Sequence, residues 1–333
     1  MRGFIMKIRV FSDIHIDINQ RFPFTLRDKE TFTLIPGDVS GNVKGTAKWI
    51  QQNVHNGMFI VGNHDPAYNE LGWTIKKQKE YLHEKFPESG PVTFMDEQVG
   101  VMAKQIPETN VLVIGSTLYT DYQYESEFLH KCISDGNKRR AENGERPLKI
   151  EEVNMAAAGR GLNDFRWGHV EDEFDDRGLK QRYLRPDDYK KWFEITFNKI
   201  EQLVQENKDR DIIIMSHHCP SPKCISERYV NDSMNASYVS DLEDFIMKNP
   251  NIRVWCCGHV HNVTIAKIGD NSQTILCNPR GYERDMECDR WSPNTFIDTD
   301  TWDVTVEPFK SKKLDDARKK FSADFMKYAP LFF

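Results

Sequence analysis

The sequence lacks long hydrophobic runs. No run approaches the roughly 18–20 consecutive apolar residues that a membrane-spanning helix needs. The N-terminus also lacks the pattern of a secretory signal peptide, because the apolar stretch after Arg2 is short and residues 7–11 are predicted to form a strand. We therefore expect no membrane partner.

An excess of positive charge is also missing. The 333 residues include 45 Lys and Arg against 51 Asp and Glu, a formal net charge of -6 with a pI near 6.0. Such a chain has no overall electrostatic attraction to nucleic acids or anionic membranes. Stable nucleic-acid binding is therefore not indicated, although a locally basic cleft or bound metal ions would change the local charge.

Cysteine is present but without a recognisable pattern. The spacing of the seven cysteines suits neither a disulfide framework nor a zinc ribbon. Cys256 and Cys257 lie in an apolar run and are expected to be buried. This usage suits a reducing compartment, so we expect a cytoplasmic protein.

Short apolar segments alternate with helical patterns in the first hundred residues. Strands are predicted over residues 7–11, 32–35 and 58–61, and helices over 46–54 and about 74–86. This alternation predicts an α/β domain, in which ligand sites lie outside the carboxyl ends of strands. Further strands are predicted over residues 92–95, 99–103, 111–115, 212–215, 253–257, 263–268, 274–276, 295–298 and 303–306.

A different composition begins at about residue 119. From there to about residue 188 the charge density rises and clean strand patterns disappear, which predicts a mostly helical insertion or cap within one domain covering 1–333. Pro186 is expected to begin a helix that runs to about Glu206. The tail from 310 to 333 is charged and then apolar at helical spacing, which predicts a C-terminal helix packed on the body.

Five short polar motifs directly follow predicted strands. Taken singly, each has an ordinary explanation, such as a turn or a structural histidine. Six of the ten histidines lie in these motifs, however, and their shared place at strand ends favours one common site. The motifs are Asp13-x-His15, Gly37-Asp38, Gly62-Asn63-His64-Asp65, Ser216-His217-His218 and Gly258-His259-x-His261.

The residue types in these motifs suit metal ions. Side chains two apart on a strand point the same way, so Asp13 with His15, or His259 with His261, can hold one ion. Mixed nitrogen and oxygen ligands favour Mn, Fe, Zn, Co or Ni over Mg or Ca. No cysteine is among the motif ligands, which argues against a thiolate zinc site there.

The order of the motifs resembles the signature of the calcineurin-like metallophosphoesterases, from Met6 to about Tyr282. The resemblance implies two packed mixed β-sheets flanked by helices, and two divalent transition-metal ions. It implies one metal site from Asp13, His15 and His261. A second site would comprise Asn63, His217 and His259, with Asp38 bridging the two ions.

The resemblance also implies a reaction: hydrolysis of a phosphate ester by a hydroxide that bridges the two metals. His64, with Asp65 behind it, would protonate the leaving group or hold the phosphate. The substrate is then a phosphate ester, with nucleotides among the candidates. All seven ligand positions carry the expected residue types, whereas a non-catalytic scaffold, the alternative outside catalysis, usually loses ligands.

The residues that would recognise the substrate are less well defined. Arg166 and Arg280 could bind phosphate, but each could instead pair with a nearby acidic residue. His218 is a further candidate, beside the expected ligand His217. Trp167 and Tyr282 could stack on a base, although core packing is the commoner role of an aromatic side chain.

The same metal core would serve a nuclease or a cyclic-nucleotide phosphodiesterase. The insertion is expected to decide between these activities because it is expected to line the pocket. Its Lys138-Arg139-Arg140 run could touch a nucleic-acid backbone, but a solvated helix face is the commoner explanation. The segments 162–166 and 278–282 further resemble a little-characterised bacterial and phage branch of the family.

Overall fold

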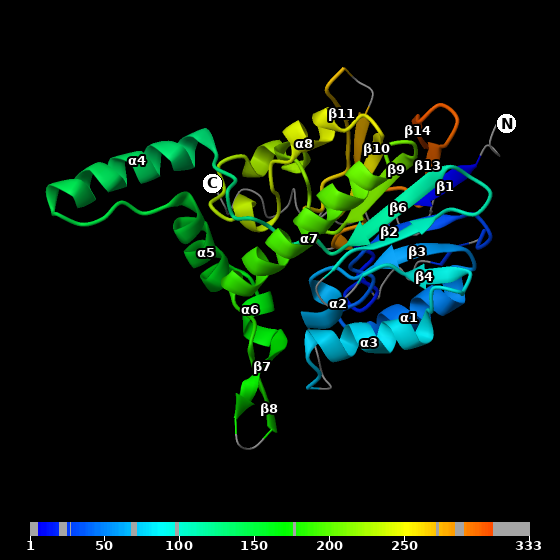
Figure 1. Cartoon of the computed structure of the whole chain (residues 1–333), viewed down its shortest axis with the longest axis horizontal. Coiled ribbons are helices and arrows are strands. Elements are labelled where there is room, and N and C mark those ends of the chain that lie inside the picture. Colours follow the sequence, from blue (N-terminus) through cyan, green and yellow to red (C-terminus); the bar gives the residue numbers. More distant parts are fainter. Residues whose placement is uncertain are drawn as a thin grey trace, which may run out of the picture.

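Two six-stranded sheets pack face to face in the computed structural model of the chain (Figure 1). The structure describes residues 6–19, 25–26, 28–67, 72–96, 100–175, 178–270, 273–283 and 290–308. In spatial order, the first sheet contains β14 (Val304–Val306), β13 (Thr295–Asp298), β1 (Lys7–Val10), β2 (Thr33–Pro36), β3 (Gly57–Ile60) and β4 (Val92–Phe94). The second contains β11 (Thr264–Ile268), β12 (Gln273–Cys277), β10 (Ile252–Cys257), β9 (Asp211–Ser216), β6 (Val111–Ser116) and β5 (Met102–Gln105).

Both sheets are mixed. In the first, β1 to β4 are parallel to one another, and β13 pairs with β1 in the antiparallel sense. In the second, β6, β9, β10 and β12 are parallel, and β5 and β11 are antiparallel edge strands. The carboxyl ends of the parallel strands therefore share one edge in each sheet.

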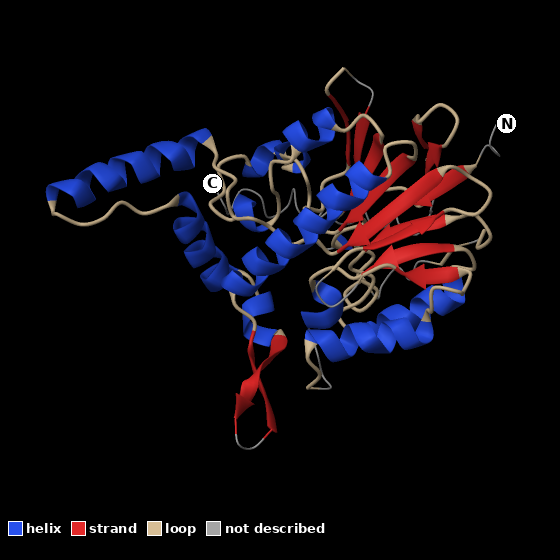
Figure 2. Cartoon of the chain, viewed as in Figure 1, coloured by secondary structure: helices blue, strands red, loops and turns tan. Residues whose placement is uncertain are grey.

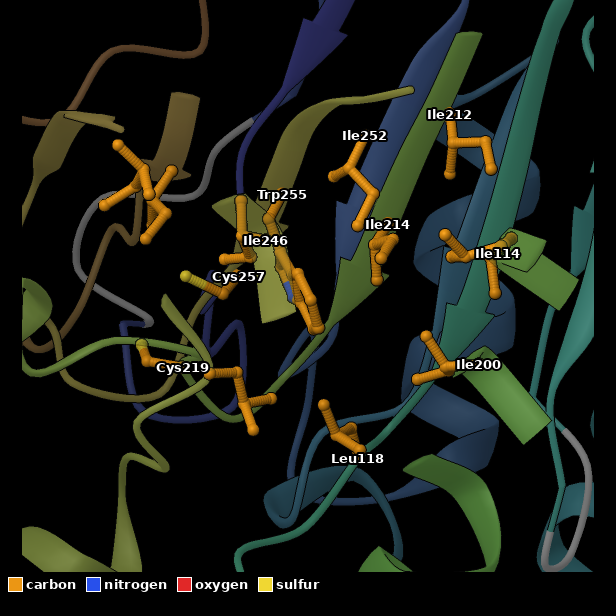
Figure 3. Packing of buried hydrophobic residues seen from close by; sticks show 14 of the residues in the cluster. Ile114, Leu118, Ile200, Ile212, Ile214, Cys219, Ile246, Ile252, Trp255 and Cys257 are labelled. Carbon is orange, nitrogen blue, oxygen red and sulfur yellow. The ribbon is translucent and has the colours of Figure 1, made fainter. Parts of the chain in front are cut away.

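Alternating side chains of the strands build a core on each face. Ile213 and Met215 of β9 join the core between the two sheets. Their neighbours Ile212 and Ile214 face outwards, into the cluster that Figure 3 shows beside Trp255. The four central residues of β9, 212–215, are all apolar because both faces of the strand are buried.

Helices cover the outer face of each sheet (Figure 2). The first sheet is covered by α1 (Val43–Asn53) and α3 (Ile75–Lys85), whose Ile50 and Leu82 join a core with Phe59. The second is covered by α7 (Pro186–Glu206) and α8 (Glu243–Lys248). The chain thus forms the expected α/β/β/α sandwich. No described helix combines the length and apolar character that crossing a membrane would require.

The predicted insertion contains α4 (Glu127–Glu142), α5 (Ile150–Gly161) and α6 (Asp164–Trp167). It also contains two strands that were not predicted, β7 (His169–Asp175) and β8 (Gly178–Tyr183), which form an antiparallel hairpin. This hairpin belongs to neither main sheet, so it needs no apolar face for the sandwich and leaves no alternating pattern in the sequence. In Figure 1, α4 and the hairpin both project away from the sheets.

Most predicted boundaries agree with the structure to within a few residues. The helix α7 begins at Pro186 as expected, because the missing N–H of proline costs nothing in the first turn. The strand predicted over 99–103 is β5, which begins later, at Met102. The predicted helix over 310–333 lies outside the described residues.

Candidate metal centre

The five motifs meet where the carboxyl ends of the two sheets converge. Three of them follow β1, β2 and β3, which are parallel neighbours. The other two follow β9 and β10, which are parallel neighbours in the second sheet. A bridge between Ser12 and Pro279 links the ends of the two sheets here. The strand ends therefore bring together side chains that are almost 250 residues apart.

Backbone conformation sets the ligand positions apart. Of the nine non-glycine residues with positive φ in the described chain, five are predicted ligands: Asp13, His15, Asp38, His259 and His261. This conformation is costly for residues with a Cβ atom and clusters at functional sites. Gly37 has a φ of +87°, and a Cβ atom there would lie 2.8 Å from Nδ1 of His217. The loops are thus shaped around the cluster of side chains.

Asp13, His15 and His261 form a first ligand group. Nε2 of His261 lies 3.3 Å from Oδ1 of Asp13 and 3.0 Å from Nε2 of His15. All three can offer one ligand atom within 4.8 Å of one another. The family resemblance implied these three residues as one metal site, and the structure brings them together.

Asp38, His217 and His259 form a second group of the same size. Nε2 of His217 lies 3.2 Å from Oδ2 of Asp38 and 3.0 Å from Oδ1 of Asn63. Nδ1 of His217 contacts the carbonyl of Pro36 at 2.8 Å, which leaves Nε2 facing the group. The structure thus places His217, rather than His218, beside Asp38.

Asp38 lies between the two groups. Its Oδ2 is 3.2 Å from His217 of the second group and 3.9 Å from Nε2 of His15 in the first. Its Oδ1 accepts a hydrogen bond from the backbone N–H of His64 at 2.9 Å. This contact orients the carboxylate and leaves Oδ2 directed at both groups.

One buried atom in the centre lacks a hydrogen-bond partner among the described residues. Nε2 of His259 is buried and makes no hydrogen bond there, whereas Oδ2 of Asp38 makes no hydrogen bond but lies 3.2 Å from the ring of His217. Leaving a buried polar group unpaired costs about 1–3 kcal/mol. The imidazole, carboxylate and amide groups here are ligands that transition metals accept. The residues therefore fit divalent metal ions.

Charge differs sharply between the histidines of the two groups. Burial lowers the pKa of His15 to about 3. Burial also acts to lower the pKa of His217, but the carboxylates of Asp38 and Asp13 outweigh it and raise that pKa to about 9. In the metal-free chain His15 is therefore neutral at pH 7, whereas His217 carries a proton that a metal ion would displace.

Asp65 ties two loops of the centre together. Its carboxylate accepts hydrogen bonds from the backbone N–H groups of Asp38, Val39, Ser40 and Gly62 at 2.8–3.2 Å, and from the hydroxyl of Thr46 at 2.5 Å. These five donors join the loop after β2 to the loop after β3. A role for Asp65 in orienting the His64 ring stays a prediction.

Asp164 is a residue of the centre that the motifs did not reveal. Its two oxygens accept hydrogen bonds from Nδ2 of Asn63 at 3.0 and 3.1 Å. The hydroxyl of Tyr189 donates to the same carboxylate at 3.1 Å. With its NH2 group held in this way, Asn63 turns its amide oxygen towards His217. The only sequence signal was the segment 162–166, whose role was unassigned.

A cleft of about 510 Å³ opens over the two groups. His64 lines it, and Nε2 of His64 lies 3.3 Å from the hydroxyl of Tyr282. Tyr282 also packs against His15 and His261, with ring centroids 4.7 and 4.6 Å apart. Tyr282 therefore lines the cleft beside the ligand groups, whereas packing in the core was the commoner role considered for it. Tyr229 and Tyr238 line the cleft as well.

The predicted substrate residues do not line this cleft in the described chain. Arg166 is exposed and donates to the carbonyl of Arg160. Arg280 is buried, ion-paired with Glu283 and placed over the ring of Trp291. Their contact with substrate stays a prediction.

His218 and Trp167 were the other two residues considered for substrate binding. His218 is buried, with its ring 4.4 Å from that of His259, so in this conformation it is closed off from the cleft. A substrate contact for His218 likewise stays a prediction. Trp167, for which core packing was the commoner reading, is 55% exposed.

A solved structure shares this fold. Phosphopantetheinyl hydrolase from Mycobacterium tuberculosis has a TM-score of 0.55 at 14% identity, over 92% of this chain and 98% of that chain, which shows the fold alone. Two other structures are less similar. A putative 5'-nucleotidase from Staphylococcus aureus has a TM-score of 0.40 at 13% identity, over 96% and 58%. A dimetal phosphatase from Danio rerio has a TM-score of 0.42 at 10% identity, over 83% and 88%.

Sequence comparison identifies the family. No curated protein sequence matches the chain. The family model described as calcineurin-like phosphoesterase matches residues 6–263, which include all five motifs. The chain therefore belongs to the calcineurin-like phosphoesterase family and is a metal-dependent hydrolase of phosphate esters.

Proposed function

We propose that the chain binds two divalent transition-metal ions and hydrolyses a small phosphate ester with His64 as general acid. One observation carries the proposal: Asp38 directs one buried carboxylate oxygen at both ligand groups, at the floor of a cleft. Asp13, His15 and His261 would hold one ion. Asn63, His217 and His259 would hold the other.

Metal ions at these positions would neutralise the phosphoryl oxygens and lower the pKa of a bound water molecule. The chain contributes the orientation of its ligands. Asp164 turns the oxygen of Asn63 inwards, Pro36 fixes the ring of His217, and the backbone of His64 fixes Asp38. Such preorganisation is what makes electrostatic stabilisation of a transition state effective.

The surroundings of His64 support the proposed role as general acid. The side chain is partly buried, lines the cleft, and contacts the hydroxyl of Tyr282 through Nε2. A leaving group that enters the cleft from this side would meet a ring nitrogen with a hydroxyl beside it. General acid catalysis by a histidine typically contributes a factor of about 10²–10⁴.

The test compares His64→Asn on p-nitrophenyl phosphate and on an alkyl phosphate. An alkoxide leaving group needs protonation more than p-nitrophenolate does, so kcat for the alkyl ester is expected to fall by the larger factor. Equal losses on both substrates would reject the acid role and leave phosphate positioning. His55→Asn, at an exposed histidine paired with Glu30, is the matched control.

A phosphodiester is the second candidate substrate, and the lining of the cleft supports it. The described lining residues include Tyr229, Tyr238 and Tyr282 but no Lys or Arg. A diester carries one negative charge where a monoester carries up to two, so it depends less on basic side chains. Aromatic rings could also stack on a planar substituent such as a nucleobase.

Nucleic-acid hydrolysis has less support. Lys138 and Arg140 form ion pairs with Asp135 and Glu145 on or beside α4, which projects from the body (Figure 1). A panel of p-nitrophenyl phosphate, bis-p-nitrophenyl phosphate, cyclic nucleotides, RNA and single-stranded DNA, each with Mn, Ni, Zn or Mg, separates these activities. A steep loss of activity with salt on the polymers alone would favour the nuclease.

A further inference from the structure

Four cysteines converge directly behind the histidine–carboxylate centre. Cys219 follows β9, Cys224 ends the 3-10 helix η1 (Pro222–Cys224), Cys257 ends β10 and Cys277 ends β12. All four are buried, and all belong to the cluster in which Figure 3 labels Cys219 and Cys257. They come from four separate segments, so the fold rather than their spacing brings them together.

The sulfur atoms are close enough to share one ion. The Sγ atoms of Cys219, Cys224 and Cys257 lie within 4.8 Å of one another, and those of Cys224 and Cys257 are 4.0 Å apart. Cys277 lies outside this group of three, but it is the direct partner of Cys257 across β10 and β12. Zinc–sulfur distances of about 2.3 Å in a tetrahedron place sulfur atoms about 3.8 Å apart. The observed spacing is near that value.

Ordinary packing is the alternative, because free cysteine often serves as a small apolar side chain. Cys256 is an example of such packing in this molecule, because it is buried on the opposite face of β10, in the core between the sheets. Cys257 and Cys277, by contrast, are direct partners across β10 and β12, on the face that the other two thiols also reach.

We propose that Cys219, Cys224, Cys257 and Cys277 bind one structural zinc ion, separate from the catalytic metal centre. Thiolate ligands suit zinc, and four protein ligands leave no open position for substrate. No redox change occurs: each thiol that binds releases its proton to solvent. The Sγ–H contacts of Cys219 and Cys277 with the carbonyl of Gly258, at 3.0 and 3.6 Å, would be given up.

The position of this site suggests what it stabilises. Cys219 lies two residues after His217, and Cys257 lies two residues before His259. An ion bound behind these residues would fix both loops that carry the histidines of the second ligand group. The zinc site would thus hold loop backbone and would not touch the substrate.

X-ray absorption at the zinc edge tests the proposal without any variant. The full chain, purified under reducing conditions and loaded with zinc, is expected to show sulfur neighbours at about 2.3 Å. The histidine–carboxylate centre contributes only nitrogen and oxygen, so a sulfur shell reports the cysteine site alone. A spectrum without sulfur, or a disulfide among the four cysteines by mass spectrometry, would overturn the proposal.

Substitution adds a second readout. Cys224→Ser and Cys277→Ser are expected to lose the sulfur shell and about one zinc ion per chain. The matched control is Cys256→Ser, which should retain both. If the variants do not fold, cobalt titration of the unaltered chain is expected to give thiolate-to-cobalt charge-transfer absorption, and its absence would refute the site. None of these readouts depends on catalysis.

Discussion

The two ligand groups of the metal centre share Asp38 but are held in different ways. The first group, represented by Asp13 and His261, lies on loops that directly follow β1 and β10. The second depends on Asn63, whose amide is fixed by Asp164 from α6, in the predicted insertion. The first group is therefore held by loops of the sandwich alone. The second is completed by a residue of the insertion, whose structure was the hardest to predict from the sequence.

The two groups also differ in proton content. In the metal-free chain His15 has a pKa of about 3, whereas His217 has a pKa of about 9. A metal ion entering the first group meets a neutral imidazole, and an ion entering the second must displace a proton. The second group should therefore be the more sensitive to pH and to changes in the insertion.

The substitution Asp38→Asn should weaken metal binding in both groups, because they share Asp38. The amide keeps the size of the side chain but removes the negative charge that faces His15 and His217. We expect a loss of activity of at least roughly 10³-fold, since each removed electrostatic contact typically costs 10²–10³. Metal analysis provides the check, with Asp300→Asn at an exposed position as control. Two metal ions per chain retained in the variant would contradict the bridging position.

Asp164→Asn should weaken metal binding in the second group and leave the first group unchanged. The amide keeps one acceptor oxygen and replaces the other by an NH2 donor, so it holds the side chain of Asn63 less firmly. Removal of such a supporting contact typically costs 10–100-fold in metal affinity. Calorimetric titration with manganese should show one weakened site and one unchanged site. Tyr189→Phe, which removes only the hydroxyl donated to Asp164, should have a smaller effect. Equal weakening of both sites would show a general loss of structure instead.

The pH dependence should sharpen the contrast. Because the pKa of His217 is raised above its unfolded value of about 6.5, its protonated form stabilises the metal-free chain below that pH. That contribution, on the order of 3 kcal/mol, is lost as the pH rises through about 9. The increase in Tm on adding metal should therefore grow between pH 6.5 and 9. An increase in Tm that is flat across this range would contradict the assignment of His217.

Arg166→Ala should have the smallest effect. The side chain is exposed, contacts the carbonyl of Arg160, and does not line the cleft. Surface changes of this kind usually alter stability by less than about 0.5 kcal/mol, and KM should stay within roughly twofold. Steady-state kinetics provides the measurement. A clear rise in KM would restore Arg166 as a substrate contact and would extend the cleft along α6.

The predictable part of the centre is the part encoded locally. A polar motif directly after an apolar strand is visible in the sequence, so Asp13, Asn63 and His259 could be found. Asp164 could not, because its contact with Asn63 spans 101 residues and depends on how the insertion folds back. Asp65 was found but its contacts were not, since only the folded loops show that four backbone N–H groups converge on it.

In the fold, too, the elements with a local sequence signal were predicted and those without one were missed. Strands buried on both faces, such as β9, contain an uninterrupted apolar run and were readily located. The β7–β8 hairpin was missed because it contributes no strand to the two sheets, and hydrophobic periodicity is the main signal for a strand. The boundary of α7 was found because Pro186 marks it within the chain itself.

The positive φ angles of the ligands have an evolutionary consequence. Glycine or asparagine would adopt the backbone conformation of His259 and His261 at lower cost. A descendant that no longer needed the metals could therefore gain stability by such replacements, and selection for stability alone would favour them. Histidine at both positions therefore costs backbone stability, which is the expected cost if both side chains bind metal ions.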